Sequence, residues 1–356
     1  MRTGKVMYRC LRVALVLLVL SALGSASRTP ATTLPHVPET SAQGPTSIQP
    51  LPQGKAQSGV VRFVALGDTG TGGPSQLAVA KQLVAFHDAR PYETAILLGD
   101  NVYPNGNPTQ LVEKFERPYA ELLRRGVRFQ AVLGNHDVTL GRTAQIHYGP
   151  FNMGGRSYYS FVKGDGLIEF FALDSNRLDN EQVRWLESAL RSSQARWKIV
   201  VMHHPLYSSA NKHGSSRTLQ SLLEPLFVRY AISAVFAGHD HVYERTTPQK
   251  GIQYFVSGAG GQLRRGNINR QSPLLAAGND QVHSFMYVEI TRDRFSFWAV
   301  SENGEILDSG HSRPGKSLNL TTALSQLRHN GVPPVPEVQT VQNPNHSNTS
   351  VILKLC

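Results

Sequence analysis

Leu97-Leu98-Gly99-Asp100-Asn101-Val102-Tyr103 is the stretch on which the organisation of this chain depends. The apolar residues 94–98 predict a buried strand, and a carboxylate, an amide and a phenol follow it directly. An ionised carboxylate can give one oxygen to each of two metal ions, and two-metal hydrolytic sites hold their ions about 3.5–4 Å apart. We therefore interpret Asp100 as a residue that bridges two ions.

The segments on either side repeat this pattern. Residues 60–66 are almost continuously apolar, as in a strand buried on both faces, and they lead into Gly67-Asp68-Thr69-Gly70. Residues 128–133 predict a further strand, which leads into Gly134-Asn135-His136-Asp137. Helices are expected between these strands, at 76–89 and 111–125. The alternation predicts a largely parallel sheet, and ligands bind at the carboxyl ends of strands in such sheets.

The later part of the chain continues with strands and helices. A hairpin is expected over 158–162 and 167–173, and helices over 180–193 and 219–230. Strands over 197–202 and 232–237 lead into His203 and into Gly238-His239-Asp240-His241. Shorter strands at 252–257, 285–290 and 294–300 are expected to complete a second sheet, with a loop over 258–280.

The two ends of the 356-residue chain differ in composition from the middle. Residues 1–26 combine four basic residues with an apolar run and predict a signal peptide, with an uncleaved membrane anchor as the alternative. We expect a flexible linker over 27–58, a catalytic domain over 59–312 and a mostly irregular tail over 313–356, with a weak helix candidate at 321–328. A signal peptide predicts that the protein is exported, and is therefore secreted or periplasmic (extracytoplasmic).

Charge and cysteine content narrow the possible partners. The formal net charge is +11, and it is +7 without the four basic residues of the leader, which suits an anionic substrate. No run of Lys and Arg interleaved with aromatic residues predicts specific nucleic-acid binding. The two cysteines are Cys10, in the leader, and Cys356, the last residue, so no internal disulfide is expected in the mature chain. We expect a small phosphorylated substrate, a monomer, and no stable membrane partner unless the leader is retained.

Five predicted strand ends carry side chains that can bind metal. Each motif alone is weak evidence for a metal ligand, because a Gly-Asp pair after a strand is most often a turn or a helix cap. Their joint occurrence is hard to obtain by chance, and oxygen and imidazole donors without thiolate suit Fe, Mn or Zn. The candidate ligands are Asp68, Asp100, Tyr103, Asn135, His203, His239 and His241.

These motifs resemble those of the calcineurin-like metallophosphoesterase superfamily. The position of Tyr103, three residues after Asp100, resembles the motif of the purple acid phosphatase branch. The compact size of the chain is similar to that of the small, tartrate-resistant type in this branch. The resemblance implies an α/β fold in four layers, α/β/β/α, with two mixed sheets flanked by helices. It also implies a ferric ion held by Asp68, Asp100, Tyr103 and His241, and a divalent ion (Fe, Zn or Mn) held by Asp100, Asn135, His203 and His239.

The resemblance further implies phosphate monoester hydrolysis by attack of a metal-bound hydroxide. His136, beside Asp137, and His213 match positions that contact the substrate phosphate or the leaving group, and the three residues are our catalytic candidates. Two alternatives stay open. One is a phosphodiesterase or nucleotidase with the same dinuclear centre, and the other is a non-catalytic exported metal-binding protein. His204 receives no role, and Asp174 is expected to be a helix cap or a residue that supports a ligand.

Overall fold

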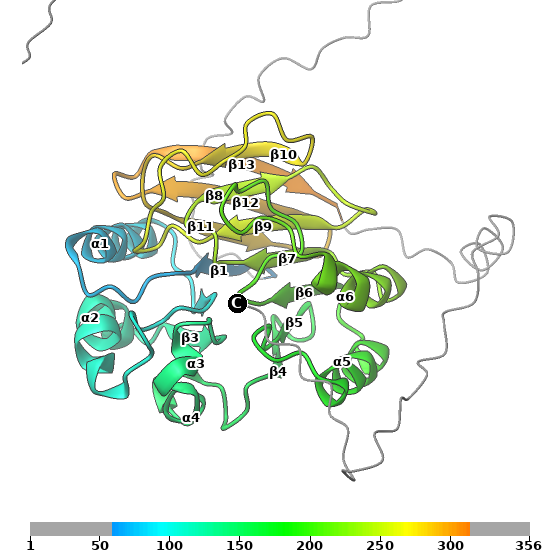
Figure 1. Cartoon of the computed structure of the whole chain (residues 1–356), viewed down its shortest axis with the longest axis horizontal. Helices are drawn as coiled ribbons and strands as arrows, with labels where there is room; N and C mark the ends of the chain where they lie inside the picture. Colours follow the sequence, from blue (N-terminus) through cyan, green and yellow to red (C-terminus); the bar gives the residue numbers. More distant parts are fainter. Residues whose placement is uncertain (1–58, 314–356) are drawn as a thin grey trace, which may run out of the picture. The chain divides into compact units, whose positions relative to one another are not determined.

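Residues 59–313 are the part of the chain that the structure, a computed structural model, describes. Two β-sheets lie face to face there, with helices on their outer faces (Figure 1). The first sheet has the strand order β13-β12-β11-β1-β2-β3. Its strands are β1 (Val61–Leu66), β2 (Thr94–Leu97), β3 (Arg128–Ala131), β11 (Ser284–Ile290), β12 (Phe295–Ser301) and β13 (Ile306–Ser312).

The second sheet has the strand order β10-β8-β9-β7-β6-β5-β4. Strands β5, β6, β7 and β9 run parallel to one another, and antiparallel strands lie at both edges. The first sheet is mixed as well, because β1 pairs in parallel with β2 and antiparallel with β11. The strands of the second sheet are β4 (Tyr159–Lys163), β5 (Ile168–Ala172), β6 (Trp197–Val201), β7 (Ala234–Ala237), β8 (Tyr243–Thr246), β9 (Gln253–Ser257) and β10 (Leu275–Asn279).

Helices connect the parallel strands and cover the sheets. Helix α1 packs on the first sheet, where the Phe86 ring lies 5.5 Å from that of Phe285 in β11. Leu186 of α5 and Leu223 of α6 share a core with Val200 of β6 in the second sheet. The helices are α1 (Pro74–Ala89), α2 (Arg117–Arg124), α3 (Asp137–Leu140), α4 (Arg142–Ile146), α5 (Asn180–Ser192) and α6 (Arg217–Arg229), with short turns η1 (Pro108–Gln110), η2 (Val112–Glu116) and η3 (Gly149–Phe151).

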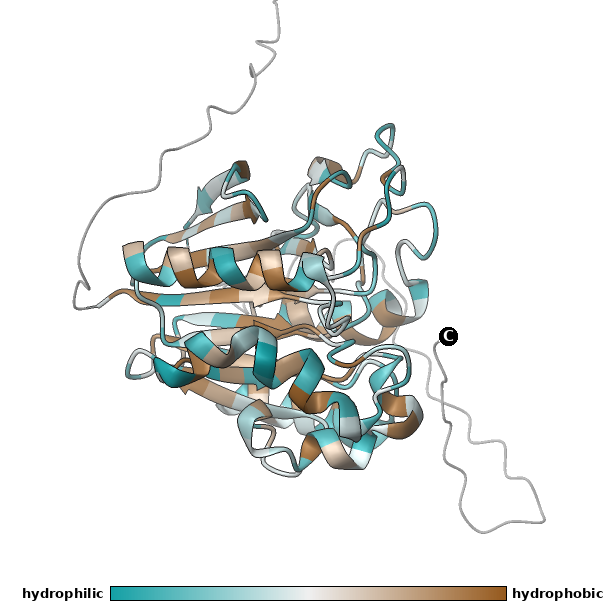
Figure 2. Cartoon of the chain, turned by 90° about the vertical axis from the view of Figure 1, so that its left-hand side faces the viewer, coloured by the Kyte–Doolittle hydropathy of each residue, from teal (hydrophilic) through white to brown (hydrophobic). Residues whose placement is uncertain are grey.

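The apolar runs in the sequence exist because both faces of the central strands are covered. In β6, Ile199 and Val201 belong to the core between the sheets, whereas Val200 belongs to the core beneath α5 and α6. The ring of Phe63 in β1 meets that of Phe170 in β5 edge-on at 5.1 Å, which joins the two sheets directly. Figure 2 shows largely brown strands and largely teal loops. The expected four-layer fold is confirmed.

One topological expectation is wrong. The strands near 252, 285 and 294 do not complete a single second sheet, because β9 pairs with β7 in one sheet while β11 and β12 extend the other. Strand β11 lies antiparallel to β1, with Phe63 opposite Val288. Hydrophobic periodicity indicates that a segment is a strand, but it does not indicate which strand lies beside it.

Three strands of the structure were not predicted from the sequence. Strand β10 lies inside the expected loop over 258–280, and its sequence Leu-Ala-Ala-Gly-Asn has no β-branched residue to indicate a strand. Strand β13 is largely polar and lies at the edge of its sheet, and β8 is a short segment of Tyr-Glu-Arg-Thr. These strands form through pairing with neighbours rather than through their own propensity.

Several expectations lie outside the described residues. The leader (1–26), the linker (27–58) and the helix candidate at 321–328 fall in ranges 1–58 and 314–356, as does all but the first residue of the tail. Within residues 59–313, none of the helices combines the length and the apolar character that a membrane crossing requires.

Candidate metal centre

The predicted ligand residues converge on one edge of the two sheets. Asp68 follows β1, Asp100 follows β2 and Asn135 follows β3, while His203 follows β6 and His239 follows β7. Backbone hydrogen bonds join the two sheets there, since Gly67 N donates to Ser257 O at 2.7 Å. The parallel strands thus bring residues from five strand ends to one place, as the sequence predicted.

Glycines allow this close approach. A Cβ atom at Gly134 would lie 2.1 Å from Oδ1 of Asp100, and one at Gly99 would lie 2.5 Å from Nδ1 of His203. Both distances are shorter than any real contact, so a side chain at either position would displace a ligand residue. Asp68 and Asp100 themselves adopt positive φ angles of 58° and 54°. Such backbone conformations are strained for non-glycine residues and cluster at functional sites.

One group of side chains consists of Asp68, Tyr103 and His241. The Tyr103 hydroxyl lies 3.1 Å from Oδ1 of Asp68 and 3.2 Å from Nε2 of His241. Oδ1 of Asp68 lies 3.4 Å from that same histidine nitrogen. The other carboxylate oxygen of Asp68 accepts the backbone N–H of His239 at 2.8 Å. Three donor atoms of different chemistry therefore surround one small space.

A second group consists of Asn135, His203 and His239. Oδ1 of Asn135 lies 3.1 Å from Nε2 of His203 and 3.0 Å from Nδ1 of His239. Nδ1 of His203 donates to the carbonyl of Leu98 at 2.8 Å, which leaves Nε2 free to face the centre. A backbone carbonyl commonly fixes the tautomer of a metal-binding histidine in this way.

Asp100 contacts residues of the second group and lies close to those of the first. Its Oδ1 is 3.6 Å from Nε2 of His203 and accepts the backbone N–H of His136 at 3.0 Å. One ligand atom from each of Asp68, Asp100 and His203 lies within 4.8 Å of those of the other two. All three side chains are almost fully buried. Buried carboxylates next to imidazoles are suited to bind cations, because a bound cation neutralises the buried negative charge.

Burial and neighbouring charges shift the pKa values of these residues. Burial, and then the carboxylates of Asp68 and Asp100, raise the pKa of Tyr103 far above its ordinary value. Burial, and then the neighbouring histidines, lower the pKa of His239. The protein alone therefore favours a neutral phenol and a neutral imidazole at these positions. Neutral imidazole is the form that binds metal.

His136 and His213 lie at the exposed side of the centre. The His136 side chain is 39% exposed, its Nε2 is 3.9 Å from Oδ2 of Asp100, and its ring lies 4.6 Å from that of Tyr103. The His213 ring lies 4.1 Å from the ring of His239, on an exposed loop between β6 and α6. Both rings thus border the candidate ligand residues from the exposed side.

Asp137 is not at the exposed side of the centre. Its side chain is fully buried and accepts backbone N–H groups of Asn101, Val102 and Gly134 at 2.8 to 3.1 Å, together with the amide of Gln145 at 2.8 Å. It ties the loop after β2 to the loop after β3. The buried carboxylate therefore positions the two loops, and the catalytic role expected of Asp137 stays a prediction.

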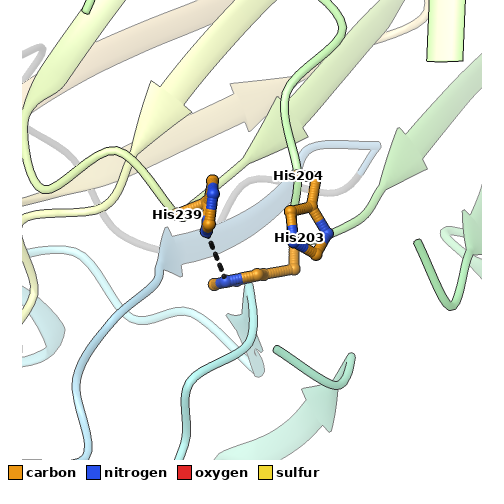
Figure 3. A group of neighbouring side chains, drawn as sticks. All are labelled: His203, His204 and His239. Carbon is orange, nitrogen blue, oxygen red and sulfur yellow. Dashed lines mark hydrogen bonds between the residues drawn. The ribbon is translucent and has the colours of Figure 1, made fainter. Parts of the chain in front are cut away.

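Asp174 and His204 have environments that the sequence did not reveal. Asp174 does not cap a helix, since Asp179 caps α5; Asp174 instead pairs with Arg142 of α4. His204 is 4% exposed and packs against His203 and His239, with ring centroids 4.9 Å and 4.4 Å away (Figure 3). The doubled histidine at 203–204 was the only signal of this arrangement in the sequence.

The fold and the convergent acidic and histidine side chains define a phosphoesterase of the metal-dependent class. A family model described as calcineurin-like phosphoesterase matches residues 61–243, which is half of the chain. The chain therefore belongs to the calcineurin-like phosphoesterase family, and it is a metal-dependent phosphoesterase.

The chain is also similar to curated proteins and solved structures. Purple acid phosphatase 4 of Arabidopsis thaliana is 29% identical over 69% of this chain and 82% of its own length. Tartrate-resistant acid phosphatase type 5 of Rattus norvegicus is 26% identical over 71% of this chain and 90% of its own length. The resemblance to purple acid phosphatases is thereby confirmed.

Two solved structures share the fold. Purple acid phosphatase PPD1 from yellow lupin (Lupinus luteus) has a TM-score of 0.63 at 20% identity and covers 72% of this chain and 54% of its own. GAP50, described as the anchor in the inner membrane complex of Plasmodium, has a TM-score of 0.63 at 22% identity and covers 76% of this chain and 94% of its own. At these identities the likeness shows the fold alone.

Proposed function

We propose that this chain hydrolyses phosphate monoesters at a dinuclear metal centre, as an acid phosphatase does. The observation that carries the proposal is the position of Asp100. Its carboxylate lies with Asp68 and His203 in one cluster of ligand atoms, so it belongs to both groups of candidate ligands. A carboxylate between two groups of donors is suited to bridge two ions.

Each group has the donor chemistry for a different ion. Asp68, Tyr103 and His241, with Asp100, offer hard oxygen donors and one imidazole, which suit Fe(III). Asn135, His203 and His239, with Asp100, offer an amide and two imidazoles, which suit a divalent Fe, Zn or Mn ion. When bound, two cations supply charge neutralisation at the phosphoryl oxygens and lower the pKa of bound water toward about 7.

The residues at the exposed side would orient the ester and handle the proton. His136 would contact the phosphoryl group, and His213 would hold a proton on its ring for the departing oxygen. A positioned acid contributes roughly 10²–10⁴-fold in rate. Burial, and then the charges of Lys212 and Arg264, lower the pKa of His213, so its protonated form is favoured at acidic pH. A lowered pKa of His213 is consistent with activity at acidic pH, as in an acid phosphatase.

The test of this proposal combines metal analysis with a matched pair of substrates. We expect two metal ions per chain by inductively coupled plasma mass spectrometry, and faster turnover of an aryl phosphate monoester than of a diester with the same leaving group. Faster turnover of the diester would favour a phosphodiesterase or nucleotidase. Two bound ions without turnover of either ester would favour a non-catalytic metal-binding protein.

We also propose that the chain is exported and acts as a monomer on a small phosphorylated substrate. The support is the leader-like composition of residues 1–26 and the positive net charge. Cell fractionation with N-terminal sequencing tests the export and the removal of the leader. Light scattering of the purified protein tests the monomer.

A further inference from the structure

His204 has a buried ring nitrogen that the described residues leave without a hydrogen-bond partner. Its Nδ1 lies 2.8 Å from Oγ of Ser175, and its backbone N–H donates to the same oxygen at 3.0 Å. Its Nε2 is fully buried and contacts no hydrogen-bonding group among residues 59–313. Buried polar atoms are nearly always satisfied, so an orphaned one calls for a water or an ion.

The surroundings of His204 favour an ion. One ring nitrogen from each of His203, His204 and His239 lies within 4.8 Å of those of the other two. Figure 3 shows these three imidazoles side by side, two from the end of β6 and one from the end of β7. Among residues 59–313, no carboxylate or carbonyl accepts a hydrogen bond from Nε2 of His204.

The geometry of the cluster is close to that of a bound transition metal. Nε2 of His203 and Nδ1 of His239 are 3.3 Å apart. Two nitrogens bound tetrahedrally at about 2.0–2.1 Å from one zinc ion are separated by about 3.3 Å. The ring nitrogen that His204 contributes to the cluster lies no more than 4.8 Å from those of His203 and His239, at most about 1.5 Å beyond that separation.

Ser175 supplies the outer partner that a metal-binding histidine requires. Histidine ligands almost always donate their other ring N–H to an oxygen, which fixes the tautomer and the orientation of the ring. Ser175 is fully buried after β5, and its hydroxyl is within 2.8 Å of Nδ1 of His204. With Nδ1 protonated toward Ser175, Nε2 carries the lone pair.

We propose that His204 is an additional nitrogen ligand of the second ion, the one that Asn135, His203 and His239 are proposed to hold. This assignment rests on the proposed dinuclear centre and adds a third imidazole to its second site. Three imidazoles in place of two make this site richer in nitrogen. A nitrogen-rich site favours Zn²⁺ over Mn²⁺ more strongly than an oxygen-rich one. His204 and Ser175 would thus set the identity of the second metal.

The experiment compares His204→Phe, which keeps a ring of similar volume, with the wild-type protein. Zinc and manganese binding are measured by competitive equilibrium dialysis, and imidazole ligands are counted by X-ray absorption at the zinc edge. We expect the variant to bind the second Zn²⁺ at least about tenfold more weakly, to lose much of its preference over Mn²⁺, and to show one fewer imidazole. His87→Phe, a partly buried histidine at the end of α1, is the control.

Ser175→Ala provides a second variant if the first does not fold. It removes only the partner of Nδ1, and we expect weaker zinc binding that Ser175→Thr restores. An unchanged affinity, metal preference and imidazole count in His204→Phe would overturn the role of His204 while leaving the dinuclear centre in place. A wild-type protein that binds no metal would overturn both.

Discussion

The hydroxyl oxygen of Tyr103 lies 3.1 Å from Oδ1 of Asp68, although the two residues follow different strands. Parallel pairing of β1 with β2 brings the loops after them together. Asp68 N donates to the carbonyl of Gly99 at 2.9 Å, and Tyr103 N donates to that of Gly70 at the same distance. The phenol and the carboxylate are therefore held side by side by backbone contacts.

Tyr103→Phe is expected to remove the colour of the iron-loaded protein. Burial and the carboxylates of Asp68 and Asp100 raise the pKa of the phenol strongly, so only a highly charged cation would bind it as a phenolate. A phenolate bound to ferric iron absorbs visible light, and phenylalanine offers no such donor. Visible absorption spectra of the two iron-loaded proteins check this. A variant with the same band as the wild type would show that Tyr103 is not the ligand responsible.

Asp100→Asn is expected to lower both metal content and activity. A neutral amide cannot supply two negatively charged oxygens to a pair of ions, so we expect fewer than two bound ions and at least a roughly 100-fold loss in kcat/KM. Asp165→Asn is a matched control, because Asp165 also has a positive φ, 51°, and lies on an exposed hairpin turn. Retention of both ions and of near-normal turnover in Asp100→Asn would contradict the bridging role.

His213→Ala is expected to affect esters with poor leaving groups most. These esters need a proton at the departing oxygen, whereas activated aryl esters do not, so kcat should fall by roughly 10²–10⁴-fold more for the former. The measurement is kcat across a series of leaving groups. His147→Ala, on an exposed turn, serves as the control. An equal loss across the series would remove His213 as the acid.

Asp137→Ala is expected to destabilise the protein because it leaves several buried N–H groups without an acceptor. We expect a loss of roughly 3 kcal/mol or more in the free energy of unfolding, since each unsatisfied buried group costs about 1–3 kcal/mol. Chemical denaturation monitored by circular dichroism checks this. An exposed substitution such as Asp293→Ala gives the baseline. A stability equal to that baseline would show that Asp137 does not tie the two loops together.

Glu244→Gln is expected to change how stability depends on pH. Burial raises the pKa of Glu244 from its ordinary value of about 4.5 to about 7. The folded state therefore binds the proton more tightly than the unfolded state, and this residue makes the wild type lose stability as pH rises from about 4.5 to about 7. The loss is about 3 kcal/mol.

The variant lacks that titration, so its stability should fall less over the same pH range. Urea unfolding at a series of pH values measures the difference between the two proteins. Glu181→Gln, in the exposed first turn of α5, is the control. Parallel pH profiles for Glu244→Gln and the wild type would show that the carboxyl of Glu244 does not titrate in this way.

Much of the candidate site was predictable because its residues follow apolar strands directly in the sequence. Gly67-Asp68 and Gly99-Asp100 end strands whose both faces are buried, so the apolar runs mark where each strand ends. Parallel pairing then brings those ends together by geometry alone. The sequence therefore determined which residues lie at the edge of the sheets and which chemistry they offer.

Only the tertiary structure decided what each polar residue contacts there. Asp137 follows His136 directly, yet it points into the protein toward backbone N–H groups, while the His136 ring lies at the exposed side. His204 follows His203, and its Nδ1 contacts Ser175, which lies nearly thirty residues earlier and after another strand. Contacts of this kind arise from packing between distant segments, and local sequence patterns carry no information about which distant segment arrives at a given position.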